Sequence, residues 1–509
     1  MPARSPVILP ALLALALMAL GAAAGQAVPS PPTERADRFG VYYWGADISA
    51  WPGSPDRLAW GADQVAAIGS RTVRVVMGPD DSYRVNPRSN ASGLGYLQRI
   101  AASPAYDALF RDPRFHTYLL TISTSTGSDR TFNAVRKQIS RLGEYLLSQA
   151  AYTGKTFILL NWEADNAIGA LPPGAPQWDD LIGRTQARAD GVRDARFRQP
   201  GSSAQLYSGL EYNLVERNGV RCGDGNVRCV IDTVAPRVTV DYYSYSAWQS
   251  LDVKRKSPAS GLAQMLRNDL GFALTKVRSR QRQVREENFI LGEWGFARSI
   301  YSECLAARDT AEMVNALEGP NAFHVSYAIY WQALDNGWRG GHRTPCVGNL
   351  GDPGDPASTA QVDWMLYGLF RGRDDTMTLS GATLQALLRG QPAPPLPRCP
   401  SIDPQGVVDP AGSGSPFLQP GGPVTISGQG FAHRGNTLLI LQADDRTNTG
   451  APNVLLELGA KGDPRWNEST QQITATLPAK DLHDGCALLW IATADGTESN
   501  AILVRIKPE

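Results

Sequence analysis

Eight apolar, β-branched or aromatic runs alternate with helix-like segments in the first part of this chain. Apolar strands that alternate with helices predict βαβ units and a parallel sheet whose two faces are both covered. Eight such units predict an α/β fold, specifically a (β/α)8 barrel of the TIM type with inserted loops. The runs are FGVYYWGADI (39–48), TVRVVM (72–77), TYLLTIS (117–123), TFILLNW (156–162), QLYSGLEY (205–212), VTVDYYSYS (238–246), NFILGEWG (288–295) and VSYAIYW (325–331). A doubly wound open sheet is the alternative, but the first run lacks the glycine-rich phosphate turn that usually follows strand one of such a sheet.

The helical pattern ends at the proline-rich stretch QPAPPLPRCP (391–400), which has the composition of a stiff connector. Short apolar runs separated by Gly, Asn and Asp turns follow it and predict an all-β sandwich. We therefore predict a barrel domain over 28–398 and an immunoglobulin-like domain over 399–509. VTISGQGF and SNAILVRI in this segment resemble the IPT/TIG immunoglobulin-like domains. A glycan, a protein or simply the barrel remain open as partners of that domain.

The N-terminus has the order of a secretory signal peptide. Arg4 precedes an apolar run, 7–20, and small residues fill 21–27. This pattern predicts a cleaved signal peptide over 1–27 and a secreted or periplasmic protein. A membrane anchor is the alternative, but the apolar run is shorter than the ~20 residues of a spanning helix. No other stretch is apolar enough to span a membrane.

An exported protein would hold its six cysteines in an oxidising compartment, so their even number predicts disulfides. Sequence alone leaves the connectivity open. Proximity along the chain favours the pairs Cys222–Cys229, Cys304–Cys346 and Cys399–Cys486. The five histidines have no paired spacing and there is no C-x-x-C motif, which argues against a metal site.

The balance of charge restricts the partners. Lys and Arg total 49, as do Asp and Glu, so the formal net charge is zero. Nucleic acids and anionic membranes are captured by basic surfaces, so neither is expected as a partner. A neutral chain with 12 Trp and 17 Tyr fits a neutral ligand such as a sugar better.

Carboxylates follow two of the eight runs at positions suited to catalysis. Barrel enzymes carry their catalytic groups at the carboxyl ends of the strands. Run four ends in Asn161-Trp162-Glu163 and run seven in Gly292-Glu293-Trp294. Glutamates from opposite sides of a barrel would face one another across its mouth, as hydrolysis of a glycosidic bond requires. Burial at the end of an apolar run would raise the pKa of one of them.

With these glutamates after strands four and seven, residues 39–390 resemble the clan A glycoside hydrolases. The resemblance implies that Glu163 is the acid/base and Glu293 the nucleophile. It implies a retaining enzyme that cleaves a poly- or oligosaccharide by double displacement without a cofactor. A non-catalytic carbohydrate-binding or adhesion protein on a degenerate barrel is the alternative function.

The same resemblance implies further site residues. Arg74 matches the strand-two arginine that hydrogen-bonds the nucleophile, and Trp331 matches the strand-eight tryptophan that floors a sugar subsite. Tyr243 or Tyr245 matches the strand-six tyrosine near the nucleophile. The sequence departs from the clan at Trp162, which stands where asparagine usually precedes the acid/base. Three amides are candidates for that asparagine's role: Asn161, Asn166 and Asn213.

Other residues remain open. Glu211 also ends a strand, so it is a rival carboxylate or a substrate-binding group, and Asp241 is a second rival. Asp165 is expected to cap the following helix. Arg74 could instead form a structural ion pair with Asp47 or another acid. Candidates for stacking on sugars are Trp44, Trp51, Trp162, Trp294, Trp331 and Trp338, and candidate rim contacts are Asp47, Asp335 and Asn336.

Overall fold

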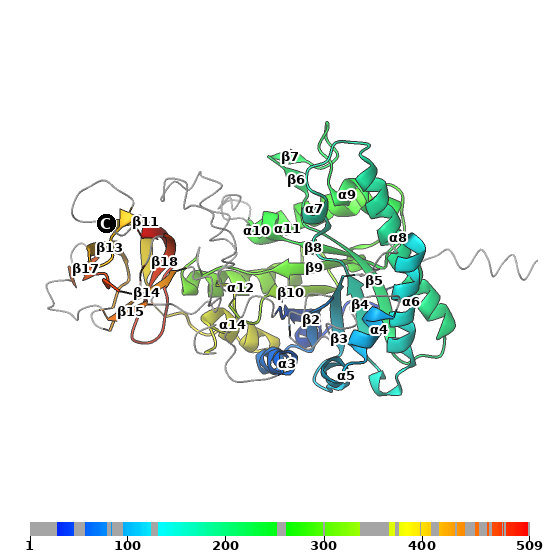
Figure 1. The fold of residues 1–509 in the computed structure, drawn as a ribbon, viewed down its shortest axis with the longest axis horizontal. Helices are drawn as coiled ribbons and strands as arrows, with labels where there is room; N and C mark the ends of the chain where they lie inside the picture. Colours follow the sequence, from blue (N-terminus) through cyan, green and yellow to red (C-terminus); the bar gives the residue numbers. More distant parts are fainter. Residues whose placement is uncertain are drawn as a thin grey trace, which may run out of the picture.

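A computed structural model of the chain shows a barrel followed by a small pair of sheets (Figure 1). The residues that the structure describes are 28–44, 56–78, 83, 95–123, 131–251, 261–298, 301–335, 366–371, 376–397, 399–408, 417–432, 435–442, 454–457, 466–467, 471–480, 482 and 485–506. The predicted signal peptide lies outside these residues. No helix among them is both long and apolar enough to cross a membrane.

Eight parallel strands close into a barrel in the order β1-β10-β9-β8-β5-β4-β3-β2, which confirms the predicted fold. The strands are β1 (Phe39–Tyr42), β2 (Thr72–Met77), β3 (Thr117–Ile122), β4 (Thr156–Leu160), β5 (Gln205–Tyr212), β8 (Tyr242–Ser246), β9 (Phe289–Trp294) and β10 (Tyr327–Trp331). All eight are almost entirely buried, as expected when helices cover the outside and side chains fill the inside.

The helices cover the outer face of the barrel (Figure 1). Their bounds are α2 (Arg35–Arg38), α3 (Arg57–Ile68), α4 (Tyr96–Ala101), α5 (Pro104–Arg111), α6 (Phe132–Ser148), α7 (Ala164–Ile168), α8 (Pro176–Arg198), α9 (Val230–Thr233), α10 (Trp248–Leu251), α11 (Gly261–Arg278), α12 (Glu303–Glu318) and α14 (Leu379–Leu388). Short 3₁₀ turns are η2 (Ala150–Tyr152), η3 (Ala235–Arg237) and η5 (Glu286–Asn288).

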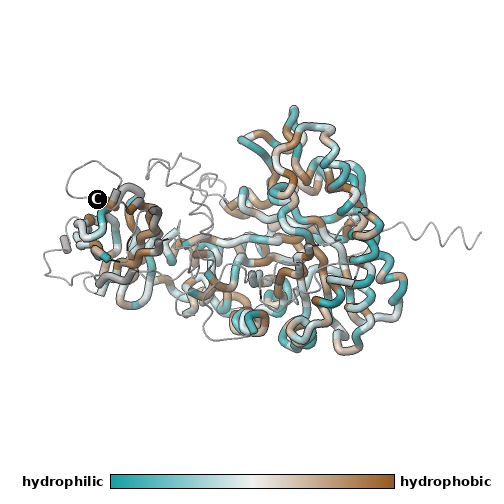
Figure 2. The backbone as a smooth tube through the Cα atoms, in the orientation of Figure 1, coloured by the Kyte–Doolittle hydropathy of each residue, from teal (hydrophilic) through white to brown (hydrophobic). Residues whose placement is uncertain are grey.

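Helix α6 shows why these segments are helical. The hydroxyl of Thr131 accepts a hydrogen bond from the backbone N–H of Ala134 at 3.2 Å and so caps the first turn. Val135, Ile139 and Leu142 recur at helical spacing and are buried against the barrel. Figure 2 shows the resulting alternation of hydrophobic and hydrophilic residues along the outer helices.

Strand β9 contains a β-bulge that determines which way its side chains face. Leu291 pairs with Tyr245 of β8, yet the next pair joins Glu293 to Ser246, so Gly292 is the extra residue. The pairing with β10 shows the same extra residue. A bulge interrupts the alternation of side chains between the two faces of a strand. Glu293 consequently faces the barrel interior and Trp294 the helices.

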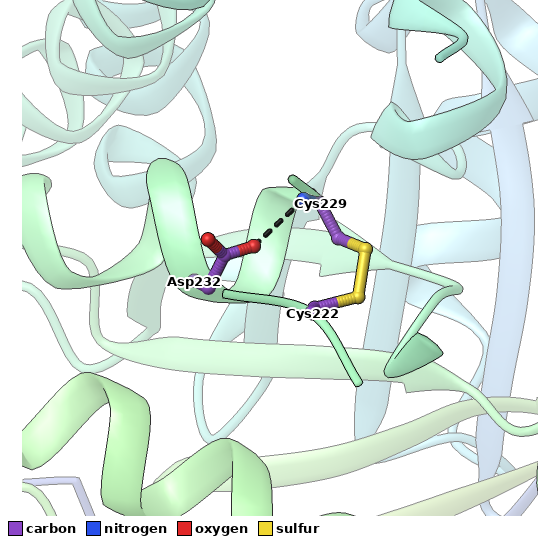
Figure 3. A group of neighbouring side chains, drawn as sticks. All are labelled: Cys222, Cys229 and Asp232. Carbon is purple, nitrogen blue, oxygen red and sulfur yellow. Dashed lines mark hydrogen bonds between the residues drawn. A yellow bond between two sulfur atoms is a disulfide. The ribbon is translucent and has the colours of Figure 1, made fainter. Parts of the chain in front are cut away.

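A long connection between β5 and β8 stands above the barrel mouth (Figure 1). It contains the hairpin of β6 (Glu216–Arg217) and β7 (Val220–Arg221), followed by α9. The disulfide Cys222–Cys229 closes this connection, as predicted. The carboxylate of Asp232 accepts the N–H of Cys229 at 2.7 Å and completes the N-terminal cap of α9 (Figure 3).

The C-terminal segment forms two sheets, as predicted for a small immunoglobulin-like domain. Their orders are β11-β13-β17-β16 and β12-β19-β18-β14-β15. The strands are β11 (Ser401–Val408), β12 (Phe417–Leu418), β13 (Pro423–Gln429), β14 (Thr437–Gln442), β15 (Val454–Glu457), β16 (Trp466–Asn467), β17 (Gln472–Thr476), β18 (Gly485–Ala492) and β19 (Ile502–Ile506). Residues that alternate along β13 and β14, such as Val424, Ile426, Leu438 and Ile440, share one core. The boundary at residue 398 and the IPT/TIG resemblance stay predictions.

A buried charge network joins this domain to the barrel. Arg298, which follows β9, forms ion pairs with Asp335 and Glu498, and all three side chains are about 3% exposed. Arg371 pairs with Glu303 at 2.6 Å and with Glu498 at 3.5 Å. Asp335 was predicted as a contact on the rim of the site, but it is buried in this network instead.

A disulfide reinforces the same junction. Cys304, in the first turn of α12, bonds to Cys399 in the connector. The predicted pairs Cys304–Cys346 and Cys399–Cys486 are therefore wrong, because nearness along the chain does not measure nearness in space. Cys346 and the side chain of Cys486 lie outside the described residues.

Candidate active site

Glu163 and Glu293 meet at the mouth of the barrel. Glu163 follows β4, Glu293 lies in β9, and both side chains are buried. Trp248, the first residue of α10, lies between them. Its indole nitrogen is 3.1 Å from Oε1 of Glu163 and 3.3 Å from Oε2 of Glu293. One donor therefore contacts both carboxylates.

These contacts limit the separation of the two glutamates. The two oxygens can be no farther apart than both distances taken together, which is less than the ~6.5 Å at which the range of inverting glycosidases begins. Retaining enzymes hold their carboxyl groups about 5 to 5.5 Å apart, because one of the two attacks the sugar directly. The shared donor holds one oxygen of each carboxylate close to the other, which is compatible with that spacing.

Arg74 and Glu211 form a second buried pair directly beside the first. Two nitrogens of Arg74 donate to the two carboxylate oxygens of Glu211, each at 2.7 Å. The hydroxyl of Ser244 donates to the same carboxylate at 2.9 Å, and the backbone N–H of Glu163 at 3.2 Å. Arg74 lies 3.5 Å from Oε1 of Glu293. The arginine expected to serve Glu293 thus makes its two short contacts with Glu211.

The electrostatics favour one proton on the Glu163–Glu293 pair. Burial, followed by repulsion from Glu211, raises the pKa of Glu163 to about 7. Burial and the charge of Glu163 raise the pKa of Glu293 well above its usual range. Because Glu211 engages Arg74 at the shorter distances, the cation only partly offsets these effects. The Arg74 contact at 3.5 Å favours placing the remaining negative charge on Glu293.

An amide chain positions Glu163 from the side of β5. The side-chain amide of Asn166 donates to Oε2 of Glu163 and accepts from the amide of Asn213 at 2.9 Å. Asp165 accepts the backbone N–H groups of Asn213 and Leu214, at 3.1 and 3.2 Å. It also accepts the N–H of Val230, at 2.8 Å. Asp165 therefore holds the connection above the mouth and caps α9 rather than the helix that follows Glu163.

The two residues before Glu163 differ sharply in role. Asn161 accepts the backbone N–H of Glu211 and donates to its carbonyl, each at 2.9 Å, and so extends the pairing of β4 with β5. Both polar atoms of its side chain are therefore bonded to the backbone of β5. Trp162 is 49% exposed, which is unusual for an indole beside a buried carboxylate.

Three aromatic residues predicted for the site face away from it. The hydroxyl of Tyr243 donates to Gln281 at 3.1 Å, and that of Tyr245 contacts Ser250 at 3.1 Å. Trp294 is fully buried and packs edge-to-face on Tyr330 at 4.9 Å. All three belong to the core between strands and helices. On β8 the residues that face the site are Ser244 and Ser246, as the alternation along a strand requires.

Trp331 lies in the inner cluster of the barrel rather than in the helical layer. It packs edge-to-face on Tyr42 at 4.8 Å and against Trp44 at 5.3 Å. The ring of Tyr42 in turn faces the guanidinium of Arg74 at 4.3 Å. Trp331 is thus connected to the charged cluster through Tyr42. The other candidates Asp47, Trp51, Asn336 and Trp338 lie outside the described residues.

Asp241 is a structural residue. It precedes β8, which places it at the amino end of the strands, opposite the mouth. Its carboxylate accepts the backbone N–H of Ser208 at 2.8 Å and forms an ion pair with Arg196. The second rival carboxylate is therefore remote from the site.

Trp248 and Ser244 are site residues that the sequence analysis missed. Alternation along run six places Ser244 on the opposite face from Tyr243 and Tyr245, but it does not show which face lines the mouth. Trp248 has no such signal, because it follows the strand and its position depends on contacts made elsewhere. Its neighbour Gln249 accepts the N–H of Val215 at 2.8 Å and donates to the carbonyl of Glu216 at 2.9 Å.

Among the described residues, one group of side chains has the spacing of a metal site: Cys222, Cys229 and Asp232 (Figure 3). The two sulfur atoms are joined in a disulfide, so neither is the thiolate that a metal would bind. Asp232 caps α9. This group is explained by folding alone.

No family model and no curated protein matches the sequence. Among solved structures, a GH1 β-glucosidase from Humicola insolens aligns with a TM-score of 0.43 and 12% identity, over 71% of this chain and 99% of that one. An endo-β-1,4-mannanase from Thermotoga petrophila aligns with a TM-score of 0.37 and 11% identity, over 93% of this chain and 98% of that one. A tri-modular GH5 endo-β-1,4-glucanase from Bacillus licheniformis aligns with a TM-score of 0.35 and 12% identity, over 93% of this chain and 79% of that one. Likeness at this level carries no argument about activity, which must be judged from the site.

Proposed function

We propose that this protein is a retaining glycoside hydrolase in which Glu293 is the nucleophile and Glu163 the acid/base. The observation that carries the proposal is the contact of one indole N–H with both carboxylates. That contact brings one oxygen of each carboxylate close together, which supports direct attack by one carboxylate and protonation by the other.

The first step forms a glycosyl-enzyme. A carboxylate oxygen of Glu293 attacks the anomeric carbon while the bond to the leaving oxygen breaks, and Glu163 gives its proton to that oxygen. Oε1 of Glu293 accepts no hydrogen bond in the structure, so this oxygen has lone pairs available for bond formation. In the second step Glu163, now ionised, takes a proton from water, and the water oxygen displaces Glu293.

Burial raises the pKa of both carboxyls, that of Glu293 included, so it is the position of Arg74 that supports this division of roles. A general acid must hold its proton near neutral pH, and burial raises the pKa of Glu163 to about 7. The nucleophile must be ionised, and Glu293 is the partner that lies 3.5 Å from the Arg74 guanidinium. Trp162 is the exposed indole beside Glu163, so it is suited to stack on the sugar that leaves. Two disulfides agree with an exported protein.

A non-catalytic carbohydrate-binding protein is the alternative function. Such a protein would have no reason to hold two buried carboxylates within reach of one donor, since their mutual repulsion costs stability. Activity on aryl glycosides and polysaccharides distinguishes the two functions, because a binding protein would retain the sugar without hydrolysing it.

Glu163→Gln and Glu293→Gln test the assignment. With aryl glycosides, loss of the acid/base should slow turnover by about 10²–10⁴-fold. Azide should restore turnover of Glu163→Gln and give a glycosyl azide of retained configuration, because azide needs no general base. Glu293→Gln should show only the background rate. Glu318→Gln, which alters a partly exposed ion pair with Arg35 far from the mouth, serves as the control. Near-normal turnover of either site variant would overturn the assignment.

A further inference from the structure

Trp248 has one hydrogen on its indole nitrogen but two acceptors within reach. An indole N–H is a donor only, and it can make one strong hydrogen bond at a time. The two distances, 3.1 Å to Glu163 and 3.3 Å to Glu293, differ by too little to exclude either acceptor. The donor therefore follows the negative charge, since a hydrogen bond to an ionised acceptor is the stronger one.

We propose that Trp248 is a positioning residue whose single N–H moves from Glu293 to Glu163 as charge moves between them during the glycosylation step. This inference rests on the proposed function. Before the step Glu293 is ionised and Glu163 protonated, so the N–H serves Glu293. Afterwards Glu293 is a neutral ester and Glu163 has given its proton to the leaving oxygen, so the N–H serves Glu163.

The surroundings of Trp248 hold the ring in place while its hydrogen bond changes partner. Its ring packs edge-to-face on Tyr367 at 5.3 Å. The neighbouring Gln249 binds the backbone at Val215 and Glu216 and so joins α10 to the disulfide-closed connection. Asp165 joins the same connection to α7, which follows Glu163. Trp248 and Glu163 are thus both held by the connection between β5 and β8.

Among the described residues, the charged and titratable side chains that face the pair come from three strands. Arg74 and Glu211 face it from β2 and β5, and Tyr42 faces it from β1. Arg74 already makes short contacts with Glu211 and reaches Oε1 of Glu293 at 3.5 Å. Trp248 lies within hydrogen-bonding distance of both carboxylates, whereas Arg74 acts on both through its charge and makes short hydrogen bonds to Glu211.

Trp248→Phe tests the inference through the pH profile of kcat/KM. A shared donor stabilises the ionised form of both carboxylates, so its loss should raise both apparent pKa values and move both limbs of the profile to higher pH. Trp178→Phe is the matched control, since its buried indole N–H donates to the Pro172 carbonyl at 3.1 Å rather than to a carboxylate. Movement of the acidic limb alone would mean that Trp248 serves only Glu293, and would overturn the inference.

A second measurement does not depend on activity or on the folding of Trp248→Phe. The indole proton resonance of Trp248 should stay downfield in Glu163→Gln and in Glu293→Gln, because the remaining carboxylate keeps the hydrogen bond. It should move upfield only in the double variant. Collapse of the shift in one single variant would overturn the inference. If the wild-type protein hydrolyses no glycoside while the resonance behaves as described, the proposed function fails and the shared hydrogen bond stands.

Discussion

Arg74 binds Glu211 through two hydrogen bonds of 2.7 Å, and both side chains are completely buried. This pair lies directly beside Glu163 and Glu293. Because Arg74 is paired with Glu211, its positive charge stabilises the ionised forms of Glu163 and Glu293 less than it otherwise would. The predictions below follow from this relationship and from the contacts that support it.

Replacing Glu211 by Gln should lower the pKa of Glu163, because the charge of Glu211 is the main cause, after burial, that raises it. In the wild-type protein we expect kcat/KM to fall as the pH rises through about 7, where Glu163 loses its proton. In Glu211→Gln this alkaline limb should move to lower pH. An alkaline limb at the wild-type position would contradict the role assigned to Glu211. The comparison uses full pH profiles rather than rates at one pH.

Gly292→Ala should reduce both stability and activity. A Cβ at this position would lie 2.1 Å from Oγ of Ser244 and 2.3 Å from Oε2 of Glu211. Crowding of this kind typically costs about 1–3 kcal/mol. Since Glu211 would have to move, Arg74 and the pH profile should change as well. Thermal unfolding and kcat/KM are the measurements, with Gly271→Ala, on the outer helix α11 where nothing lies near the added Cβ, as the control.

The disulfide between Cys304 and Cys399 should contribute strongly to stability. It closes a sequence separation of 95 residues, and loops of about that length are stabilised by roughly 2–5 kcal/mol. Cys304→Ser combined with Cys399→Ser should therefore lower the unfolding temperature clearly. Peptide mapping without reduction should recover the two cysteines in one linked pair. A Cys304–Cys346 peptide instead would contradict the structure.

Glu498→Gln should weaken the junction between the barrel and the C-terminal sheets. Removing the sole partner of a buried charge typically costs about 3–5 kcal/mol, and the cost here should be smaller because Arg298 keeps Asp335 and Arg371 keeps Glu303. Here Arg298 loses a partner and Arg371 loses its longer contact. The more exposed pair of Arg184 and Asp180 should contribute no more than about 1 kcal/mol, so Asp180→Asn is the comparison. Equal effects of the two substitutions on unfolding would contradict a buried network.

The barrel could be predicted because its strands are recognised without knowing which side chains face inward. Strands buried on both faces are apolar throughout, so runs such as TVRVVM and TFILLNW indicate strands whichever way their side chains point. For the same reason, an apolar run does not show which of its side chains face the barrel interior and which face the helices. Nothing in VTVDYYSYS shows that Ser244 rather than Tyr243 or Tyr245 faces the mouth.

Two features of the site required coordinates. The bulge at Gly292 reverses the facing of Glu293 and Trp294, and a bulge is defined by pairing with β8 and β10 rather than by its own residues. Trp248 reaches the carboxylates because α10 is held by a connection more than thirty residues earlier in the chain, through Gln249. The glutamates themselves were predictable, since each closes a strong strand.

Trapping the glycosyl-enzyme tests the central claim most directly. A 2-deoxy-2-fluoro glycoside with a good leaving group, made from the sugar that the hydrolysis assays identify, should inactivate the protein and leave one sugar attached. Peptide mass spectrometry should place that sugar on Glu293. A sugar on Glu163 or Glu211 would contradict the account, as would hydrolysis that inverts the anomeric configuration and leaves no adduct.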